Sequence, residues 1–353
     1  MTFFISQLSF SVFAANKIVV IGSENMHKGL LTSFDLEHTP TNLSYTLPNN
    51  YIIEVKSNTA PLDEISQQED VLAIVCQTSN ECALALKDSA AKDLLVISAT
   101  ASSRLLGDAE NIWRMAPSNA LQAKAIYNEI KTETAQEPIA IIYEPQDYGF
   151  DLYASMMEEV FFNTILENDG PKLAGAIPFH MNVNLDETQK SITADKAIAA
   201  LQDFSKMGIK SVAYFGYRDG FNALTDETMG GSPNVVNHWY VGDGVAIQPD
   251  EKPLNLSVFK PYSPNIAGEI NTPAYYYAHD AGTLLSKAMT KMGTTTDPDR
   301  SFFLDTAKTL ELSNEETKTG KKTFNTADEH GVFNVDVYDS LGNLQTKQIT
   351  FTR

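Results

Sequence analysis

The sequence predicts an α/β protein of two lobes, each with a parallel sheet between helices, joined by a hinge. Short apolar runs recur along the chain, helical patterns follow most of them, and this series occurs twice. The length of 353 residues also exceeds what one ordinary core needs. Apolar residues make up 43% and charged residues 20%, and the mean hydropathy is −0.20, as is typical of globular proteins.

Each element follows from a local pattern. The strands are nearly continuous apolar runs, as expected when helices cover both faces of a sheet. In the first series we expect strands at 17–21, 51–55, 72–75 and 94–97, with a helix at 81–91. In the second we expect helices at 119–132, 150–166 and 195–207 and strands at 139–143, 173–177, 211–215 and 235–241. Helices follow at 274–292 and 301–312, and 324–351 predicts antiparallel strands joined by a turn at 340–343.

Two series that each form a core predict two lobes with a binding cleft between them. The chain is expected to cross between lobes at Ala116-Pro117-Ser118 and within 245–253, where Pro249 and Pro253 restrict the backbone. We therefore assign 16–117 plus 248–322 to the N-terminal lobe and 118–247 plus 323–353 to the C-terminal lobe.

The N-terminal segment 1–15 is interpreted as a signal peptide. Residues 3–14 are mostly apolar, and Val12-Phe13-Ala14 fits a cleavage signal before Ala15, although no Lys or Arg precedes the apolar run. The alternative is an N-terminal strand. Cys76 and Cys82 would close a small loop in an exported protein, or remain as two unpaired thiols.

The charge and the missing motifs narrow the function. A formal charge of −19 argues against nucleic acid and anionic membranes as partners, because both need clustered Lys and Arg. The chain has no phosphate loop, dinucleotide fingerprint, nucleophile elbow or HExxH motif, and its six histidines are scattered singly. An active site can assemble from residues far apart in the sequence, so these absences do not exclude an enzyme, but they favour a protein that is not an enzyme and has no cofactor or metal.

Three segments in order carry a family resemblance: Ser98–Ser103, Trp113–Ser118 and Tyr143–Gly149. In these the chain resembles the type I periplasmic solute-binding proteins of ABC importers, especially the leucine/isoleucine/valine-binding branch. The resemblance implies two Rossmann-like lobes that close on a small polar ligand, an amino acid or an amide-like compound. It further implies a periplasmic monomer that delivers the ligand to an ABC permease. A ligand-sensing module of the same fold and an enzyme that uses the cleft are the alternatives.

The resemblance also implies ligand-binding residues. Ser79 matches the first loop of the family's site, and Thr100 and Ser102 match positions that offer a carbonyl, an amide and a hydroxyl to a carboxylate. Tyr148 and Tyr214 match second-lobe tyrosines, and Asp243 falls where family members carry the acid that pairs with the ligand ammonium.

Each residue also has a plain structural interpretation. Ser102 or Ser103 could cap a helix, and Asp243 next to Gly244 is typical of a turn. Tyr148 and Tyr214 could be half-buried aromatic residues at strand ends.

Two features depart from the family pattern. Ala99 and Arg104 stand where the pattern has prolines, which predicts a less rigid loop with a positive charge close to the site. The segment Gly22–Phe34 lacks the glycine-rich loop that normally contacts the ligand side chain. The identity of the ligand is therefore not predicted.

Overall fold

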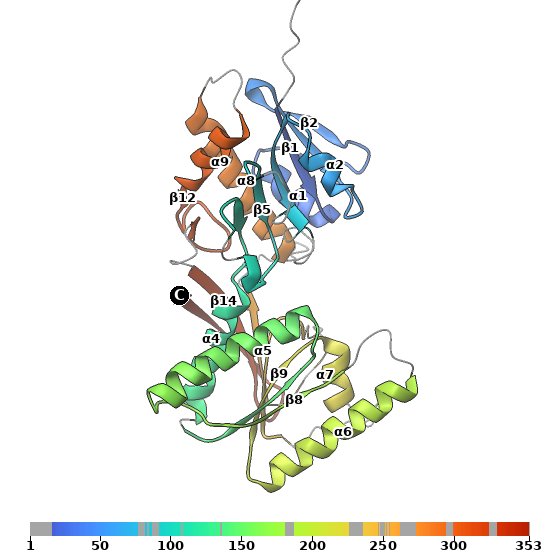
Figure 1. Cartoon of the computed structure of the whole chain (residues 1–353), viewed down its shortest axis with the longest axis vertical. Helices are drawn as coiled ribbons and strands as arrows, with labels where there is room; N and C mark the ends of the chain where they lie inside the picture. The colour runs from blue at the N-terminus through green and yellow to red at the C-terminus, as the bar shows by residue number, and fades with distance from the viewer. Residues whose placement is uncertain are drawn as a thin grey trace, which may run out of the picture.

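The protein is represented by a computed structural model with two mixed sheets in separate halves of the molecule (Figure 1). It describes residues 16–76, 82, 85–86, 92–106, 109–134, 136–180, 187–225, 236–245, 247, 251, 253, 255–261, 273–293, 299–324 and 330–352. The predicted signal peptide lies outside these residues, as does most of the predicted helix 81–91. Among the described helices, none has the length and apolar content needed to cross a membrane.

The first sheet has six strands in the order β2-β3-β1-β4-β5-β6, all parallel to their neighbours except β2. Its strands are β1 (Asn16–Ile21), β2 (Ser44–Thr46), β3 (Tyr51–Lys56), β4 (Val71–Cys76), β5 (Leu95–Ser98) and β6 (Ile112–Arg114). The helices between them are α1 (Glu24–Thr32), α2 (Leu62–Ser66) and the short 3₁₀ helices η1 (Pro48–Asn50) and η2 (Arg104–Leu106).

Alternate residues of these strands enter two separate cores, because successive side chains of a strand point to opposite faces. Ile18 and Val20 pack against α1, α8 (Pro273–Met292) and α9 (Arg300–Lys308). Val19 and Ile21 pack on the other face with Ile65 of α2. Two helices from late in the chain thus complete the first half.

The second sheet has seven strands in the order β15-β14-β11-β10-β9-β7-β8. Its parallel strands are β7 (Ile139–Tyr143), β8 (Leu173–Pro178), β9 (Ser211–Phe215), β10 (His238–Val241) and β11 (Leu256–Pro261). The antiparallel hairpin β14 (His330–Tyr338) and β15 (Leu344–Thr352) is added beside β11, and a separate pair, β12 (Glu311–Leu312) and β13 (Lys322–Thr323), lies outside both sheets.

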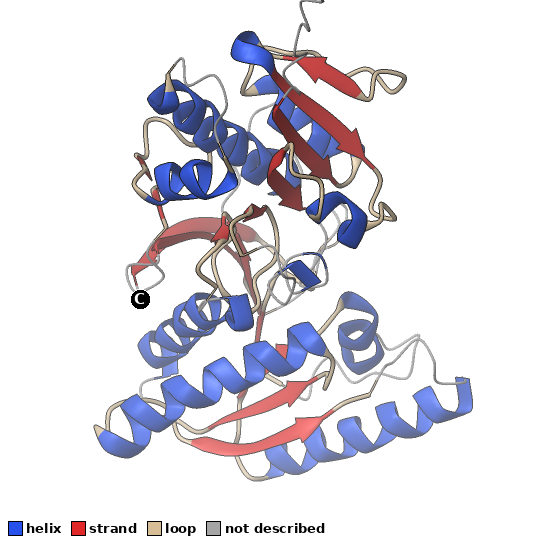
Figure 2. Ribbon diagram, turned by 45° about the horizontal axis from the view of Figure 1, so that its top comes forward, coloured by secondary structure: helices blue, strands red, loops and turns tan. Residues whose placement is uncertain are grey.

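Helices cover both faces of the second sheet (Figure 2). One core contains residues of α4 (Asn119–Thr134) and α5 (Asp147–Glu159), which continues as a π-helical segment, η3 (Val160–Leu166). The other contains residues of α6 (Glu187–Lys206) and α7 (Arg218–Thr225). Alternate residues such as Ile141 and Ile142 enter the two cores, as in the first sheet.

These sheets confirm the predicted α/β class. The eight predicted strands of the two series are present, with ends shifted by up to three residues, and the antiparallel tail forms β14 and β15. The predicted lobe boundary, which gives 248–322 to the N-terminal lobe, differs from the structure at β11. That strand pairs with β10 and β14 in the second sheet. Predicted helix 301–312 ends at Lys308, since Glu311 and Leu312 pair with β13 instead.

Cys76 and Cys82 form a disulfide, so of the two states left open by the sequence the structure has the bonded one. Closing a loop of seven residues restricts the unfolded chain and stabilises the fold by about 2 kcal/mol. We expect reduction to lower the free energy of unfolding by about this amount, measured by urea denaturation with and without dithiothreitol. A Cys76→Ser/Cys82→Ser variant is the control, because reductant should not change its midpoint. An unchanged midpoint in the fully reduced parent protein would contradict the prediction.

Candidate functional site

The two sheets place their loops in the same way. If the parallel strands of each sheet are counted in chain order, both sheets read 2-1-3-4-5: β3-β1-β4-β5-β6 in the first, β8-β7-β9-β10-β11 in the second. In such sheets the connections leave strands 1 and 3 in opposite directions, and ligands bind at the carboxyl ends of the strands beside that point. The second sheet has β7 and β9 there, followed by Glu144 and Gly216.

Asp243 follows β10 at this edge, and two side chains hold one of its oxygens. Tyr148, the second residue of α5, donates its hydroxyl to Asp243 Oδ1 at 2.7 Å, and Gln122 Nε2 of α4 donates to the same oxygen at 2.9 Å. Within the described residues, Asp243 Oδ2 has no hydrogen-bond partner, and the residue is exposed. The carboxylate is therefore fixed in orientation, with one oxygen available to a cation.

The tyrosine hydroxyl has two acceptors in reach and only one proton. Asp243 is nearer than Gln122 Oε1, which lies at 3.2 Å, and it carries a charge, so Asp243 receives the proton. Burial, and then the negative charge of Asp243, raise the pKa of Tyr148 well above its ordinary value. The phenol is thus a hydrogen-bond donor throughout the physiological pH range.

Glycines and a second aromatic ring shape the surroundings of Asp243. A Cβ at Gly242 would lie 2.2 Å from the Tyr148 hydroxyl oxygen, so only glycine allows the tyrosine to approach. The ring of Tyr217, 47% exposed, lies with its centroid 5.7 Å from that of Tyr148. Aromatic faces beside a carboxylate favour a bound ammonium group.

Tyr214 lies beneath this surface. It is fully buried in β9, and its hydroxyl donates to Glu144, which also accepts a hydrogen bond from Tyr217 N at 3.1 Å. Burial first, and Glu144 second, raise the pKa of Tyr214 well above its ordinary value. A Cβ at Gly220 would lie 2.2 Å from the same hydroxyl oxygen. Tyr214 and Glu144 therefore fix the turn that carries Tyr217.

The hydroxyl-rich loop lies at the carboxyl end of β5. Its backbone is attached on both sides, because Ala99 N donates to Cys76 O at 2.8 Å and Asn119 N donates to Ser102 O at 2.7 Å. Thr100 and Ser102 are both partly buried. Ser103 has the capping role that the sequence left open, since its hydroxyl accepts a hydrogen bond from Leu105 N at 3.2 Å.

No protein-family model matches the chain, and the search of curated proteins gave no match. Solved structures do match over nearly the whole chain. An ABC transporter substrate-binding protein from Desulfitobacterium hafniense, in complex with Leu, superposes with a TM-score of 0.70 at 13% identity, covering 94% of this chain and 99% of the other. This chain has the type I periplasmic-binding-protein fold.

Two further structures with this type I periplasmic-binding-protein fold have similar scores. The leucine-binding protein LivK from Thermotoga maritima gives a TM-score of 0.65 at 14% identity, covering 95% of this chain and 98% of the other. The branched-chain amino acid transporter substrate-binding protein LivJ from Streptococcus pneumoniae, in complex with isoleucine, gives a TM-score of 0.66 at 13% identity. The match covers 96% of this chain and 100% of the other. All three are binding proteins.

The structure brings together only some of the ligand-binding residues predicted from the sequence. Tyr148 and Asp243 are in contact, Thr100 and Ser102 lie in one loop of the first sheet, and Tyr214 contacts Glu144 instead of Asp243. Ser79 lies outside the described residues. In the described part of the chain, no three His, Cys, Asp or Glu side chains are grouped so that they could hold a metal ion.

Sequence reasoning missed Gln122 and Glu144. Gln122 lies on the buried side of α4 and is 121 residues away from Asp243, so no local pattern points to the pair. Glu144 had a usable signal. A carboxylate placed directly after the buried strand 139–143 lies at the carboxyl end of a parallel sheet, where polar residues meet ligands or one another.

Proposed function

We propose that this protein is an exported solute-binding protein that captures a free amino acid, or a closely related amide, and delivers it to an ABC permease. Asp243 carries the proposal, because one of its oxygens is fixed by Tyr148 and Gln122 and the other is available to an ammonium group. The structurally similar proteins, which include complexes with leucine and isoleucine and a leucine-binding protein, support the choice of ligand class.

In this proposal the two sheets supply opposite ends of the ligand site. Asp243 and the rings of Tyr148 and Tyr217 receive the ammonium group. Thr100 and Ser102, together with Ser79, offer hydroxyl and backbone donors to the carboxylate. Binding across both halves favours the arrangement in which they are close together, since only there does the ligand contact both.

Thermal denaturation with amino acids tests this function. A ligand that binds only the folded protein stabilises it by about 2.7 kcal/mol at a concentration of 100 Kd, which raises the melting temperature. We expect L-leucine or another free amino acid or amide of the screen to raise it. N-acetyl-L-leucine, which lacks the ammonium group, should have no effect. If no amino acid or amide raises the melting temperature, the proposed function is wrong. If N-acetyl-L-leucine acts like L-leucine, the role of Asp243 is wrong.

A further inference from the structure

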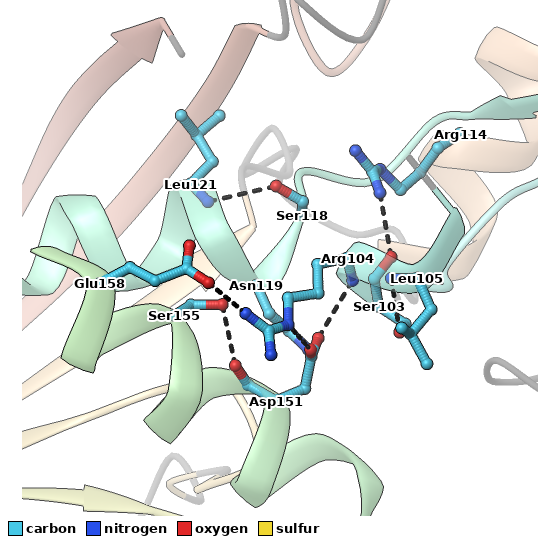
Figure 3. Close-up of polar contacts among 10 residues, drawn as sticks. All are labelled: Ser103, Arg104, Leu105, Arg114, Ser118, Asn119, Leu121, Asp151, Ser155 and Glu158. Carbon is cyan, nitrogen blue, oxygen red and sulfur yellow. Dashed lines mark hydrogen bonds and ion pairs between the residues drawn. The ribbon is translucent and has the colours of Figure 1, made fainter. Parts of the chain in front are cut away.

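Arg104 joins the hydroxyl-rich loop of the first half to helix α5 of the second (Figure 3). Arg104, the first residue of η2, donates its backbone N–H to Asp151 Oδ2 at 3.1 Å, and its Nε lies 2.9 Å from Asp151 Oδ1. Both oxygens of one carboxylate are thus bound by one residue of the other half. Such a two-point contact fixes orientation as well as distance.

The Asp151 side chain is largely buried and hydrogen-bonded. It is only 10% exposed, and Asn119 Nδ2, at the start of α4, donates to Asp151 Oδ2 at 2.7 Å. The same Asn119 donates its backbone N–H to Ser102 O in the hydroxyl-rich loop. Asp151, Asn119 and Arg104 therefore form one connected polar group at the place where the chain passes from β6 to α4. The carboxylate of Asp151 is largely shielded from water, whereas the Arg104 side chain is 31% exposed.

Both partners stand close to candidate ligand residues. Arg104 comes two residues after Ser102, and Asp151 comes one helical turn after Tyr148. The ion pair with Asp151 restrains the loop at Arg104.

We propose that Arg104 and Asp151 are positioning residues that hold the hydroxyl-rich loop against α5 and thereby set how the two halves are arranged relative to each other. Their contact fixes the distance between the Thr100–Ser103 loop and the Tyr148–Asp243 pair. The test uses ligand-free protein, so its result does not depend on the proposed amino acid function.

Glu158 provides a matched control. It lies two turns after Asp151 on α5, and its carboxylate contacts Arg104 Nη1 (Figure 3). Its side chain is 49% exposed, so water and salt weaken this outer contact. Glu158→Gln removes the charge of a carboxylate that contacts the same guanidinium, and it should leave the arrangement of the halves unchanged.

The experiment measures distances between spin labels on the two halves by pulsed electron paramagnetic resonance. Labels are attached to Phe302→Cys on α9 and Met207→Cys after α6, both exposed positions, while the native cysteines stay in their disulfide. We expect one narrow distance distribution for the parent protein and for Glu158→Gln. Arg104→Ala and the isosteric Asp151→Asn should increase the population outside that distribution at least fivefold.

Charge exchange separates this role from general stability. Arg104→Asp combined with Asp151→Arg restores an ion pair and should move the distribution back toward that of the parent. If the exchanged pair does not fold, Arg104→Lys replaces it, since it keeps the charge and the backbone N–H and should give a smaller change than Arg104→Ala. The proposal is overturned if Arg104→Ala, folded by circular dichroism, has the distribution of the parent. It is also overturned if the restoring variant is no closer to the parent than Arg104→Ala.

Discussion

Replacing Asp243 by alanine is expected to weaken binding of the amino acid identified in the thermal screen about 100-fold, because the ammonium group then loses its carboxylate partner. A hydrogen bond to a charged group contributes about 1.5–3 kcal/mol, and each 1.4 kcal/mol is a factor of ten in Kd. Isothermal titration calorimetry measures the loss directly. Asp243→Asn keeps the shape and one acceptor oxygen, so its affinity should lie between those of Asp243→Ala and the parent.

The control for this prediction is Asp203→Ala, which removes a carboxylate of α6 that is 70% exposed and pairs with Lys206. We expect this variant to bind like the parent protein, which shows that the effect is not one of net charge. Equal affinities of Asp243→Ala and the parent would remove Asp243 from the site.

The second large effect concerns stability. Asp280, in the middle of α8, is fully buried and accepts hydrogen bonds from Lys318 N at 2.7 Å and from the backbone N–H and hydroxyl of Thr319. Asp280→Ala leaves two backbone N–H groups without acceptors, and each such loss costs about 1–3 kcal/mol. We expect the free energy of unfolding to fall by about 3–4 kcal/mol, as measured by urea denaturation.

Two variants define the origin of that loss. Asp280→Asn keeps one acceptor oxygen but turns an N–H group toward a donor, so we expect its free energy of unfolding to fall by roughly 2 kcal/mol. Asp305→Ala removes an exposed carboxylate from the neighbouring helix α9 and should change stability by less than about 0.5 kcal/mol. If Asp280→Ala unfolds at the same urea concentration as Asp305→Ala, these hydrogen bonds do not stabilise the fold.

The strands were predictable where apolar residues run without a break. The segments 139–143 and 211–215 are strands with the same bounds in sequence and structure, since burial on both faces leaves a continuous apolar pattern. β11 was missed because its apolar run is short, with Ser257 inside it and Lys260 and Pro261 at its end. Helix α1 was missed because Gly29 weakens its helical signal. A Cβ there would lie 2.1 Å from Tyr275 O of α8, so the glycine is explained only by tertiary packing.

The candidate site was predictable as loops but not as contacts. The sequence indicates that Tyr148 and Asp243 end up at one edge of a sheet, because both follow apolar strands. That the two touch, and that Gln122 joins them, depends on how α4, α5 and β10 pack. The same holds for Arg104 and Asp151, which are 47 residues apart and belong to different halves of the molecule.

The chain order of the elements has a consequence for synthesis on the ribosome. The core on one face of the first sheet is completed by α8 and α9, which follow the parallel strands of the second sheet in the chain. The second sheet in turn has β14 and β15 at the C-terminal end of the described residues. A nascent chain that ends at residue 261 holds every parallel strand of both sheets but lacks part of the core of each. The first half cannot finish folding before α8 and α9 have been made, nor the second before β14, so until then the growing chain exposes apolar surface.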